Sequence, residues 1–335
     1  MINTRIKHVI DRCVTNSTGC IAHTNLQFPN RRQGKVRDTY TNGDKLIIVS
    51  TDRQSAFDRQ LACVPFKGQV LNLCSTWWMD KTRHIVPNAL LHVPDPNIAV
   101  MQRCNVFPVE VIVRGYVTGS TSTSLWTAYA KGDREYCGHV IPDGLKKNER
   151  LPCGPIVTPT TKSDIRDVPI SGAEIVCEGL MTRKEWDEVE RAALRLFAYG
   201  QETAAERGLI LVDTKYEFGV NPKTGQIMLV DEIHTPDSSR YWIRESYMDC
   251  FASEREPESI DKEFLRLWYK AHCDPYNDPV LPDAPLALVA ELAARYVHLY
   301  ERITGSNFQL PDLHMDPDVR MHHALCNKND ILDWT

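Results

Sequence analysis

Hydrophobic and polar residues alternate with two different periods along the chain, and a period of two dominates its first third. The apolar run at 45–50 (KLIIVS) follows a turn and predicts a short buried strand. The run at 109–114 (VEVIVR) predicts another strand, in which Glu110, Ile112 and Arg114 share one face because successive side chains point to opposite faces. We therefore expect the first part of the chain to consist mainly of strands and turns.

A helical period takes over in the middle of the chain. Thr182 and Glu185 have the spacing of a capping box, which predicts a helix that starts there and ends at Gly208. A strand over 209–220 should follow directly, turn through a segment rich in Asn, Pro and Gly, and return over 226–233 as a hairpin. The middle of the chain is thus expected to mix helix and strand.

Both ends of the chain carry helical patterns. Near the C-terminus, helices are expected over 261–270 and over 285–305, the second with Pro at its start and Gly at its end. The polar tail beyond Gly305 lacks periodicity, and we expect it to be loosely ordered. At the N-terminus, 1–14 places its apolar residues on one face, which favours a surface helix; a basic organelle presequence is the alternative.

Together these patterns predict an α/β (α+β) fold in three parts. A β-rich lobe is expected over 1–107, a central α/β lobe over 108–255, and a helical segment with its polar tail over 256–335. Ligand sites occur preferentially in clefts between such units, so the cleft between the two lobes is the expected site.

Composition and charge narrow the function classes. The 335 residues are 42% hydrophobic and carry 39 Lys plus Arg against 44 Asp plus Glu, a formal net charge of −5. This balance argues against a nucleic-acid partner, because phosphate contacts along a duplex need a basic excess. No apolar run approaches the ~20 residues of a membrane helix, which argues against a membrane partner. Small anionic ligands remain compatible, and the sequence leaves the oligomeric state open.

The cysteines point to a reducing compartment. There are 11 of them, an odd number, and no two form a C-x-x-C pair. A disulfide framework and a zinc site are both disfavoured by this spacing. We therefore expect reduced thiols and a cytoplasmic location.

The predicted hairpin carries the first candidate chemistry. In its first strand Asp213, Lys215 and Glu217 share one face, and its second strand changes from apolar residues to Asp231 and Glu232. Carboxylates beside a lysine suit Mg²⁺ bound together with nucleotide phosphates, since Mg²⁺ typically takes one or two carboxylates. The alternative is a solvated strand with cross-paired charges. Periodicity leaves open whether Asp231 or Glu232 faces Glu217.

A second candidate follows the strand at 109–114. Arg114 ends this strand, and the Gly and hydroxyl run at 115–124 leads into a predicted short helix. An arginine fork, serine hydroxyls and backbone N–H groups at a helix start favour a phosphate site. The alternative is a helix cap beside an Arg114–Glu110 ion pair.

Two weaker signals remain. Lys262 and Arg266 lie four residues apart on one predicted helical face, and an anionic ligand, water or neighbouring acids would neutralise them. The segment 34–38 (GKVRD) could cover a nucleotide as a glycine loop does, although it matches neither standard phosphate-loop pattern.

Taken together and in order, seven segments resemble the phosphoribosylaminoimidazole-succinocarboxamide synthase (SAICAR synthetase) family. Any one of them is weak, but seven in order are specific, and the resemblance covers roughly residues 30 to 305. The segments are 34–38 (GKVRD), 51–58 (TDRQSAFD), 109–120 (VEVIVRGYVTGS), 155–162 (PIVTPTTK), 213–219 (DTKYEFG), 230–242 (VDEIHTPDSSRYW) and 261–266 (DKEFLR).

The resemblance implies a fold and a reaction. It implies a SAICAR synthetase-like α/β fold with a nucleotide cleft between two lobes, distantly similar to ATP-grasp enzymes and kinases. It also implies an ATP-dependent ligase of de novo purine biosynthesis that joins L-aspartate to a carboxylated aminoimidazole ribonucleotide, with ADP and phosphate as further products. The carboxylate would be activated as an acyl phosphate. The implied partners are small molecules only, with Mg²⁺ accompanying ATP.

The same resemblance implies roles for individual residues. Gly34 and Lys35 would contact ATP, Glu217 and Asp231 would bind ATP through Mg²⁺, and Asp213 and Lys215 would be catalytic. Glu110 and Asp167 would hold a second metal; many family members have His where this chain has Arg166, whereas the acid is kept. The residues implied in substrate binding are Arg114, Ser120, Arg240, Lys262, Arg266, Asp52, Ser55 and Asp58.

Three other functions compete with this interpretation. Another ATP-dependent carboxylate–amine ligase would share most of the chemistry. A protein kinase is disfavoured because the H-R-D and D-F-G elements are absent from the sequence. A non-catalytic nucleotide-binding module would not need to retain both Glu217 and Asp231.

Overall fold

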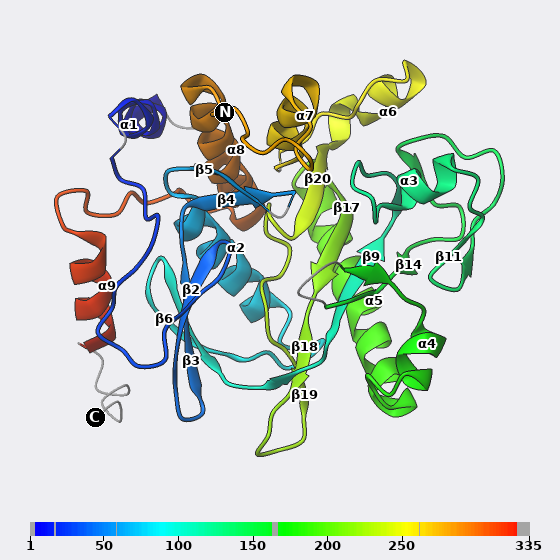
Figure 1. Ribbon diagram of the computed structural model, residues 1–335, viewed down its shortest axis with the longest axis horizontal. Coiled ribbons are helices and arrows are strands. Elements are labelled where there is room, and N and C mark those ends of the chain that lie inside the picture. The colour runs from blue at the N-terminus through cyan, green and yellow to red at the C-terminus, as the bar shows by residue number, and fades with distance from the viewer. Residues whose placement is uncertain (1–3, 17, 58, 163–166, 261, 327–335) are drawn as a thin grey trace.

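The fold consists of two lobes and a group of helices around them (Figure 1). The computed structural model describes residues 4–16, 18–57, 59–162, 167–260 and 262–326. The strands of the first lobe form an antiparallel five-stranded sheet in the order β1-β2-β3-β7-β6. Their bounds are Arg32–Gln33 (β1), Arg37–Asn42 (β2), Lys45–Ser50 (β3), Leu90–Asp95 (β6) and Ile98–Gln102 (β7). The strand predicted over 45–50 is confirmed.

Opposite faces of this sheet bury different partners, as strand alternation requires. Helix α2 (Lys67–Lys81) packs on one face against side chains such as Met101. On the other face, Ile47 and Val100 pack against helix α9 (Pro317–Cys326). A two-stranded unit, β4 (Arg53–Ala56) with β5 (Arg59–Cys63), stands beside the sheet.

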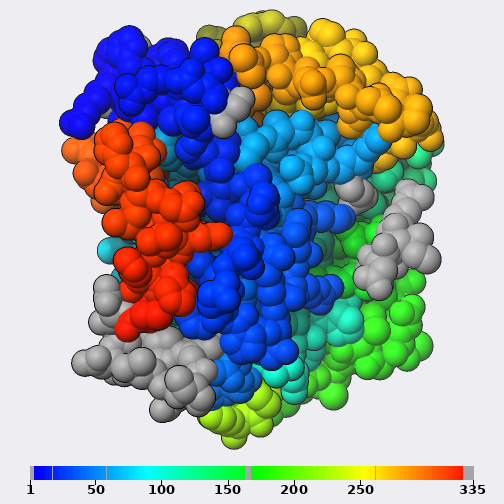
Figure 2. Space-filling model, turned by 60° about the vertical axis from the view of Figure 1, so that its left-hand side comes forward, coloured from blue at the N-terminus to red at the C-terminus, as the bar shows by residue number. Residues whose placement is uncertain are grey.

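The prediction of a loosely ordered tail is wrong for helix α9. Met321 and Leu325 on this helix are buried against the sheet, and Arg320 forms an ion pair of 2.8 Å with Asp95. In Figure 2 the C-terminal segment, coloured red, lies along the blue N-terminal part of the surface. The error arose because the helix supplies few apolar contacts of its own, and tertiary packing rather than periodicity stabilises it.

The second lobe is built on a six-stranded sheet. Its order is β16-β15-β9-β17-β20, and β14 also pairs with β9. The bounds are Val109–Arg114 (β9), Ile156–Val157 (β14), Thr160–Thr161 (β15), Val168–Pro169 (β16), Leu209–Tyr216 (β17) and Ser239–Ile243 (β20). The strand predicted over 109–114 is confirmed.

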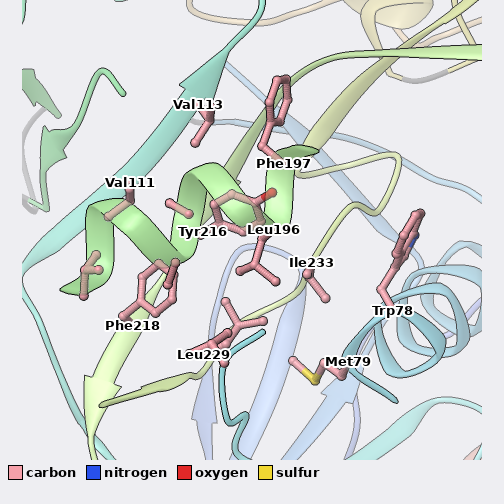
Figure 3. Close-up of a cluster of buried hydrophobic side chains, with 14 of the residues drawn as sticks. Trp78, Met79, Val111, Val113, Leu196, Phe197, Tyr216, Phe218, Leu229 and Ile233 are labelled. Carbon is pink, nitrogen blue, oxygen red and sulfur yellow. The ribbon is translucent and has the colours of Figure 1, made fainter. Parts of the chain in front are cut away.

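Helix α5 (Arg183–Glu206) covers one face of this sheet and builds the main core. Its N-terminus has the predicted capping box between Thr182 and Glu185, and Gly208 follows its C-terminus with φ 69°. Leu196 and Phe197 on the helix belong to the same hydrophobic cluster as Val113 and Tyr216 on the sheet (Figure 3). The helix and its boundaries are therefore confirmed.

The predicted hairpin exists, but it is shorter than expected. Strand β18 (Phe218–Val220) pairs with β19 (Ile227–Leu229), and β18 also pairs with β8 (Asn105–Val106). The chain breaks at Glu217, so β17 does not continue into the hairpin and pairs instead with β9 and β20. The prediction of one strand over 209–220 is therefore wrong.

Helices close the molecule at one end. Helix α8 (Leu286–Thr304) runs from Pro285 to Gly305, as predicted, and α1 (Thr4–Thr15) packs on it with Ile6 and Ile10 buried. Helix α7 is displaced from its predicted position by about half a turn. The remaining elements are α3 (Leu125–Ala130), α4 (Gly172–Cys177), α6 (Arg244–Ala252), α7 (Glu263–His272), β10 (Tyr116–Val117), β11 (Glu135–Tyr136), β12 (His139–Val140) and β13 (Glu149–Arg150).

Candidate active site

A cluster of acids surrounds Lys215 where the two lobes meet; we call it the acidic cluster. The ammonium group of Lys215 lies 2.9 Å from a carboxylate oxygen of Glu110, 2.6 Å from Glu217 and 3.6 Å from Asp231. Strand β9 supplies Glu110, β17 supplies Lys215, and the hairpin supplies the other two acids. Side chains that are distant in sequence therefore converge on one lysine.

The contacts of the hairpin show which acid faces this cluster. Phe218 pairs with Leu229, and the backbone N–H of Val230 donates to the carbonyl of Glu217 at 3.0 Å. Strand β19 ends at Leu229, and beyond it Asp231 lies 3.6 Å from Lys215, which Glu217 also contacts. Glu232 turns toward the hydroxyl of Thr235, which donates to it at 2.5 Å. The question left open by the sequence is therefore answered in favour of Asp231.

Further cations contact these acids from outside the hairpin. Arg37 on β2 forms an ion pair with Asp231 and lies 3.7 Å from Glu232, and Lys162 forms an ion pair with Glu217. Arg37 and Glu232 also line a small cavity between the first sheet and α2, together with Ile48, Met101 and Val230. The cavity has room for little more than one water molecule, and its apolar side chains adjoin the charged cluster.

The pKa values of the acids differ within the cluster. Burial raises the pKa of Glu217, and the negative charge of Asp231 raises it further against the opposing effect of Lys215. Burial also acts on Asp231, but the charges of Arg37 and Lys215 outweigh it and hold its pKa well below the ordinary value. The cluster therefore favours the charged form of Asp231, whereas burial and the charge of Asp231 disfavour the charged form of Glu217.

Two residues before Lys215, the same strand carries the opposite arrangement; we call it the basic cluster. Asp213 lies 2.5 Å from Arg240 on β20 and 3.7 Å from Arg114 on β9, each directly opposite it in the sheet. Arg114 also donates to the hydroxyl of Thr158 at 2.8 Å. The alternative Arg114–Glu110 ion pair is wrong, because Glu110 pairs with Lys215. The two arginines favour a positioning role for Asp213 over the catalytic role that was predicted.

Helix α7 adds further charges to the basic cluster. The hydroxyl of Ser120 donates to the carboxylate of Glu263 at 2.5 Å, and Arg266 lies 3.3 Å from the same carboxylate. Arg240 approaches it to 3.8 Å. Burial raises the pKa of Glu263, but the charges of Arg240 and Arg266 outweigh it and lower the value to about 2. Three residues predicted to bind substrate, Ser120, Arg240 and Arg266, are therefore brought together around an acid.

A buried ion pair lies behind the basic cluster. Lys67, which is fully buried on α2, lies 2.9 Å from Asp237, and the hydroxyl of Tyr296 on α8 donates to the other oxygen of Asp237 at 2.6 Å. Burial lowers the pKa of nearby Lys262 to about 8, and the charge of Arg266 adds to this effect against that of Asp237. The charge of Lys262, which precedes α7, is thus influenced by Asp237 of this ion pair.

The predicted glycine loop lies between β1 and β2. The N–H of Gly34 donates to the carbonyl of Arg37 at 2.7 Å, and a Cβ at this glycine would lie 3.0 Å from that oxygen. The buried side chain of Arg53 donates to the carbonyls of Gly34, at 3.0 Å, and Lys35, at 3.2 Å. The side chain of Lys35 is exposed. The backbone of the loop is therefore held by hydrogen bonds from Arg53.

Three other predicted site residues, Asp52, Ser55 and Asp167, are described by the structure in different surroundings. The carboxylate of Asp52 accepts hydrogen bonds from the backbone N–H groups of Ile21 and Gly68, both at 2.8 Å, which favours a structural role. Burial raises its pKa to about 6. Ser55 is half-buried on β4, Asp167 is exposed, and Asp58 lies outside the described residues.

Several functional candidates were missed by the sequence reasoning. Arg37 and Lys162 lie in the quoted segments GKVRD and PIVTPTTK, but nothing in their local pattern shows that they meet Glu217 and Asp231. Glu263 lies in the segment DKEFLR, in which only Lys262 and Arg266 were predicted to bind substrate. Only Lys67 gave no signal at all, because its partner Asp237 is remote in sequence.

Other kinds of site can be assessed for the described part of the chain. Within it, no three or more His, Cys, Asp or Glu side chains are grouped so that they could hold a metal ion. No helix there is long and apolar enough to cross a membrane. All eleven cysteines are free thiols, as expected.

A two-lobed α/β fold with adjoining acidic and basic clusters defines an enzyme for small charged substrates, and comparison with known proteins gives its family. Residues 30–282 match the family described as SAICAR synthetase. The chain is 62% identical over 289 residues to phosphoribosylaminoimidazole-succinocarboxamide synthase from Legionella pneumophila (strain Lens), covering 86% of this chain and 92% of that one. It is 57% identical to the chloroplastic enzyme of Arabidopsis thaliana, covering 88% of this chain and 72% of that one. The chain therefore belongs to the SAICAR synthetase family.

Solved structures agree with this membership. The SAICAR synthase of Saccharomyces cerevisiae, complexed with SAICAR, superposes with a TM-score of 0.74 at 33% identity, covering 87% of this chain and 100% of that one. A SAICAR synthetase in complex with ADP gives a TM-score of 0.64 at 25% identity, covering 84% and 100%. The predicted fold class is thus confirmed.

Proposed function

We propose that the protein catalyses the ATP-dependent joining of L-aspartate to a carboxylated aminoimidazole ribonucleotide, giving SAICAR, ADP and phosphate in purine biosynthesis. One observation carries the proposal: Asp213 and Lys215 on a single strand are the centres of a basic and an acidic cluster. This reaction must bind a nucleotide with its metal beside a second phosphorylated substrate. Two adjoining clusters of opposite charge suit that requirement. The membership of the family supports the same assignment.

ATP belongs in the acidic cluster. Its base would lie beside the apolar side chains of Ile48, Met101 and Val230, where the small cavity would have to widen, and its phosphates would lie near Arg37 and the glycine loop. Glu217 and Asp231 would hold Mg²⁺, which usually takes one or two carboxylates together with phosphate oxygens. Both carboxylates contact Lys215, which supports this because the two side chains lie close enough together to share one cation. Mg²⁺ held there would stabilise the charge that develops in phosphoryl transfer.

The phosphate of the ribonucleotide belongs in the basic cluster. Arg114, Arg240 and Arg266 provide guanidinium groups, and Ser120 and Lys262 provide further donors. Arginine binds phosphate through two parallel hydrogen bonds, so several forks in one pocket suit a terminal phosphate. The imidazole carboxylate would then point toward Lys215, between the two clusters. Glu110 and Asp167 remain proposed ligands of a second metal near that carboxylate.

The chemistry would proceed in two balanced steps. A carboxylate oxygen of the imidazole attacks the γ-phosphorus, the bond to the bridging oxygen breaks, and ADP leaves. The amine of aspartate then bonds to the acyl carbon, and phosphate leaves with the former carboxylate oxygen and an amine proton. Lys215, Arg37 and Lys162 would orient the reacting oxygens and offset their charge, an effect that is strong in a site shielded from water.

The reaction is tested by measuring ADP release with ATP, Mg²⁺, the ribonucleotide and single amino acids. We expect release only when all substrates are present and L-aspartate is the amino acid. Equal turnover with glutamate or glycine would refute the choice of acceptor. Nucleotide binding without turnover in every mixture would instead support a non-catalytic module.

The acyl phosphate is tested separately with the ribonucleotide labelled by ¹⁸O in its carboxylate. We expect one labelled oxygen in the released phosphate, because the leaving oxygen comes from the carboxylate. Unlabelled phosphate would exclude this intermediate while leaving the overall reaction intact. The free thiols support a further proposal, that the enzyme works in a reducing compartment such as the cytoplasm.

A further inference from the structure

The carboxylate of Glu263 occupies the place in the basic cluster where a phosphate is expected. It accepts a hydrogen bond from Ser120 at 2.5 Å and lies 3.3 Å from Arg266 and 3.8 Å from Arg240. These three side chains come from a loop, a helix and a strand, so their common contact is not a consequence of sequence proximity. Each of them is also a proposed ligand of the ribonucleotide phosphate.

Hydrogen-bond stoichiometry makes the two occupants exclusive at Ser120. A serine hydroxyl has one proton to donate. When Ser120 donates to a phosphate oxygen, its bond to Glu263 must break. The guanidinium groups have several donors and can serve both acceptors, so the exchange is centred on Ser120.

Electrostatic repulsion also opposes the presence of Glu263 and a phosphate in the pocket at the same time. Glu263 is ionised at neutral pH, since its pKa is about 2. A phosphate dianion entering beside this carboxylate meets a like charge in a poorly solvated pocket, where repulsion is weakly screened. Ligand binding therefore requires the Glu263 side chain to move or to lose part of its cationic surroundings.

We propose that Glu263 is an internal competitor of the substrate phosphate, which fills the anion pocket of the empty enzyme and is displaced by the ribonucleotide. The proposal rests on the proposed function, because it takes this pocket as the phosphate site. Small monovalent or weakly held anions would gain too little from the pocket to displace the carboxylate. A ribonucleotide, which also contacts the enzyme through its base and carboxylate, would displace it. Glu263 is thus a specificity-determining residue.

Inorganic phosphate binding to Glu263→Gln, measured by calorimetry, tests the idea. The amide keeps the size of the side chain and can still accept from Ser120, but it lacks the charge. We expect inorganic phosphate to bind about tenfold more tightly than to the unmodified enzyme, as a charge-assisted hydrogen bond contributes more than a neutral one. Glu258→Gln, which removes the charge of an exposed acid just before α7, should leave phosphate affinity unchanged.

A second variant keeps the test informative if Glu263→Gln folds poorly. Glu263→Asp retains the charge but shortens the side chain by one methylene, so its contact with Ser120 should weaken. We expect phosphate affinity between that of the unmodified enzyme and that of the amide. Unchanged or weaker phosphate binding in both variants would overturn the proposal and assign Glu263 the role of holding Arg240 and Arg266 in place.

Arg240→Ala separates this proposal from the assignment of the pocket. If Arg240→Ala weakens ribonucleotide binding but Glu263→Gln does not strengthen phosphate binding, only the competition is refuted. If Arg240→Ala leaves ribonucleotide affinity unchanged, the pocket is not the phosphate site, and both proposals fail at this point. Competition is supported when Arg240→Ala weakens binding and Glu263→Gln strengthens it.

Discussion

The acidic and basic clusters differ in the sign of the charged side chains that are in excess. Around Lys215 and the neighbouring Arg37 together, the acids outnumber the cations: Glu110, Glu217 and Asp231 contact Lys215, Glu232 lies 3.7 Å from Arg37, and the only further cation is Lys162 among the described contacts. Around Asp213 the cations are in excess: Arg114, Arg240 and Arg266 face Asp213 and Glu263. One cluster therefore attracts a cation, and the other attracts an anion.

This difference shows how one strand separates two ligands of opposite charge. Asp213 and Lys215 lie on the same face of β17, two residues and thus roughly 6.6 Å apart. Each is the minority charge of its cluster, and each holds the majority side chains in fixed positions. Ion pairs within a site of this kind orient ligand-binding groups more than they stabilise the fold, because desolvation offsets much of their attraction.

The largest effect is expected from Asp231→Asn. The substitution is nearly isosteric but removes a charged oxygen ligand from the proposed Mg²⁺ site, and Mg²⁺ prefers such ligands. We expect kcat to fall by roughly 10²–10³-fold, as for other losses of charge stabilisation in an active site. Steady-state rates across a Mg²⁺ series would measure this, with Asp80→Asn as an exposed control. Near-normal kcat would exclude Asp231 as a metal ligand.

The same variant also tests the surroundings of Asp231 without ligands. Because Arg37 and Lys215 hold its pKa below the ordinary value, its charge stabilises the folded protein above the unfolded pKa. That stability is lost as the pH falls toward the folded pKa. We therefore expect Asp231→Asn to lower the melting temperature slightly at pH 7. A collapse of the melting temperature would indicate a mainly structural role.

Arg240→Ala should have the next largest effect, confined to the basic cluster. A charged hydrogen bond contributes roughly 1.5–3 kcal/mol, so the affinity for the ribonucleotide should fall about ten- to hundred-fold. ATP affinity should hardly change, since Arg240 contacts Asp213 and Glu263 and not the acidic cluster. Arg114→Ala should act similarly, but it also removes the hydrogen bond to Thr158 and is less specific. Equilibrium binding of each substrate alone would show whether the two clusters are independent.

A smaller effect is expected from the titration of Lys262. Its pKa of about 8 means that it loses its charge as the pH rises from 7 to 9, whereas a phosphate monoester is already a dianion there. If the charged form binds the phosphate, the dissociation constant for the ribonucleotide should rise about tenfold over this range. Lys262→Arg should abolish the pH dependence, because an arginine stays charged. A flat profile for the unmodified enzyme would remove Lys262 from the site.

Much of this architecture could be predicted from the sequence, but the irregularity in β17 that changes which side chains face the core could not. Before the irregularity between Leu211 and Asp213, odd-numbered Leu209 and Leu211 pack into the core against α5. After it, odd-numbered Asp213 and Lys215 face the site, and Tyr216 packs into the core. A β-bulge shifts the alternation by one residue, and no residue type in the strand marks it.

The convergence of distant residues was also beyond the sequence. Motif resemblance identified Glu217, Asp231, Arg114 and Arg240 as candidates, because each lies in a segment of the family. It grouped Glu217 with Asp231 at Mg²⁺ and Arg114 with Arg240 as substrate-binding residues, but it did not show the ion pairs around them, and Arg37 and Glu263 were passed over. Ion pairs such as Arg37 with Asp231 join segments 194 residues apart, so only the packing of the two lobes determines them.

The smallest effect is expected from Tyr296→Phe, which tests how far the basic cluster extends. The hydroxyl of Tyr296 donates to Asp237 at 2.6 Å, and Lys67 lies 2.9 Å from the other oxygen of the same carboxylate. Removing the hydroxyl leaves the ring packed and the ion pair in place. A hydrogen bond to a charged group contributes about 1.5–3 kcal/mol, and the remaining partner of Asp237 should limit the loss in unfolding free energy to about 1–2 kcal/mol. Substrate affinities should stay within about twofold, since this ion pair lies behind the basic cluster and is not predicted to contact a ligand.

Denaturant unfolding and ribonucleotide binding would be measured together, with Tyr199→Phe as the control; Tyr199 contacts Trp78 through its ring. A fall in ribonucleotide affinity at unchanged stability would contradict this boundary, because it would place Asp237 within the basic cluster instead of behind it.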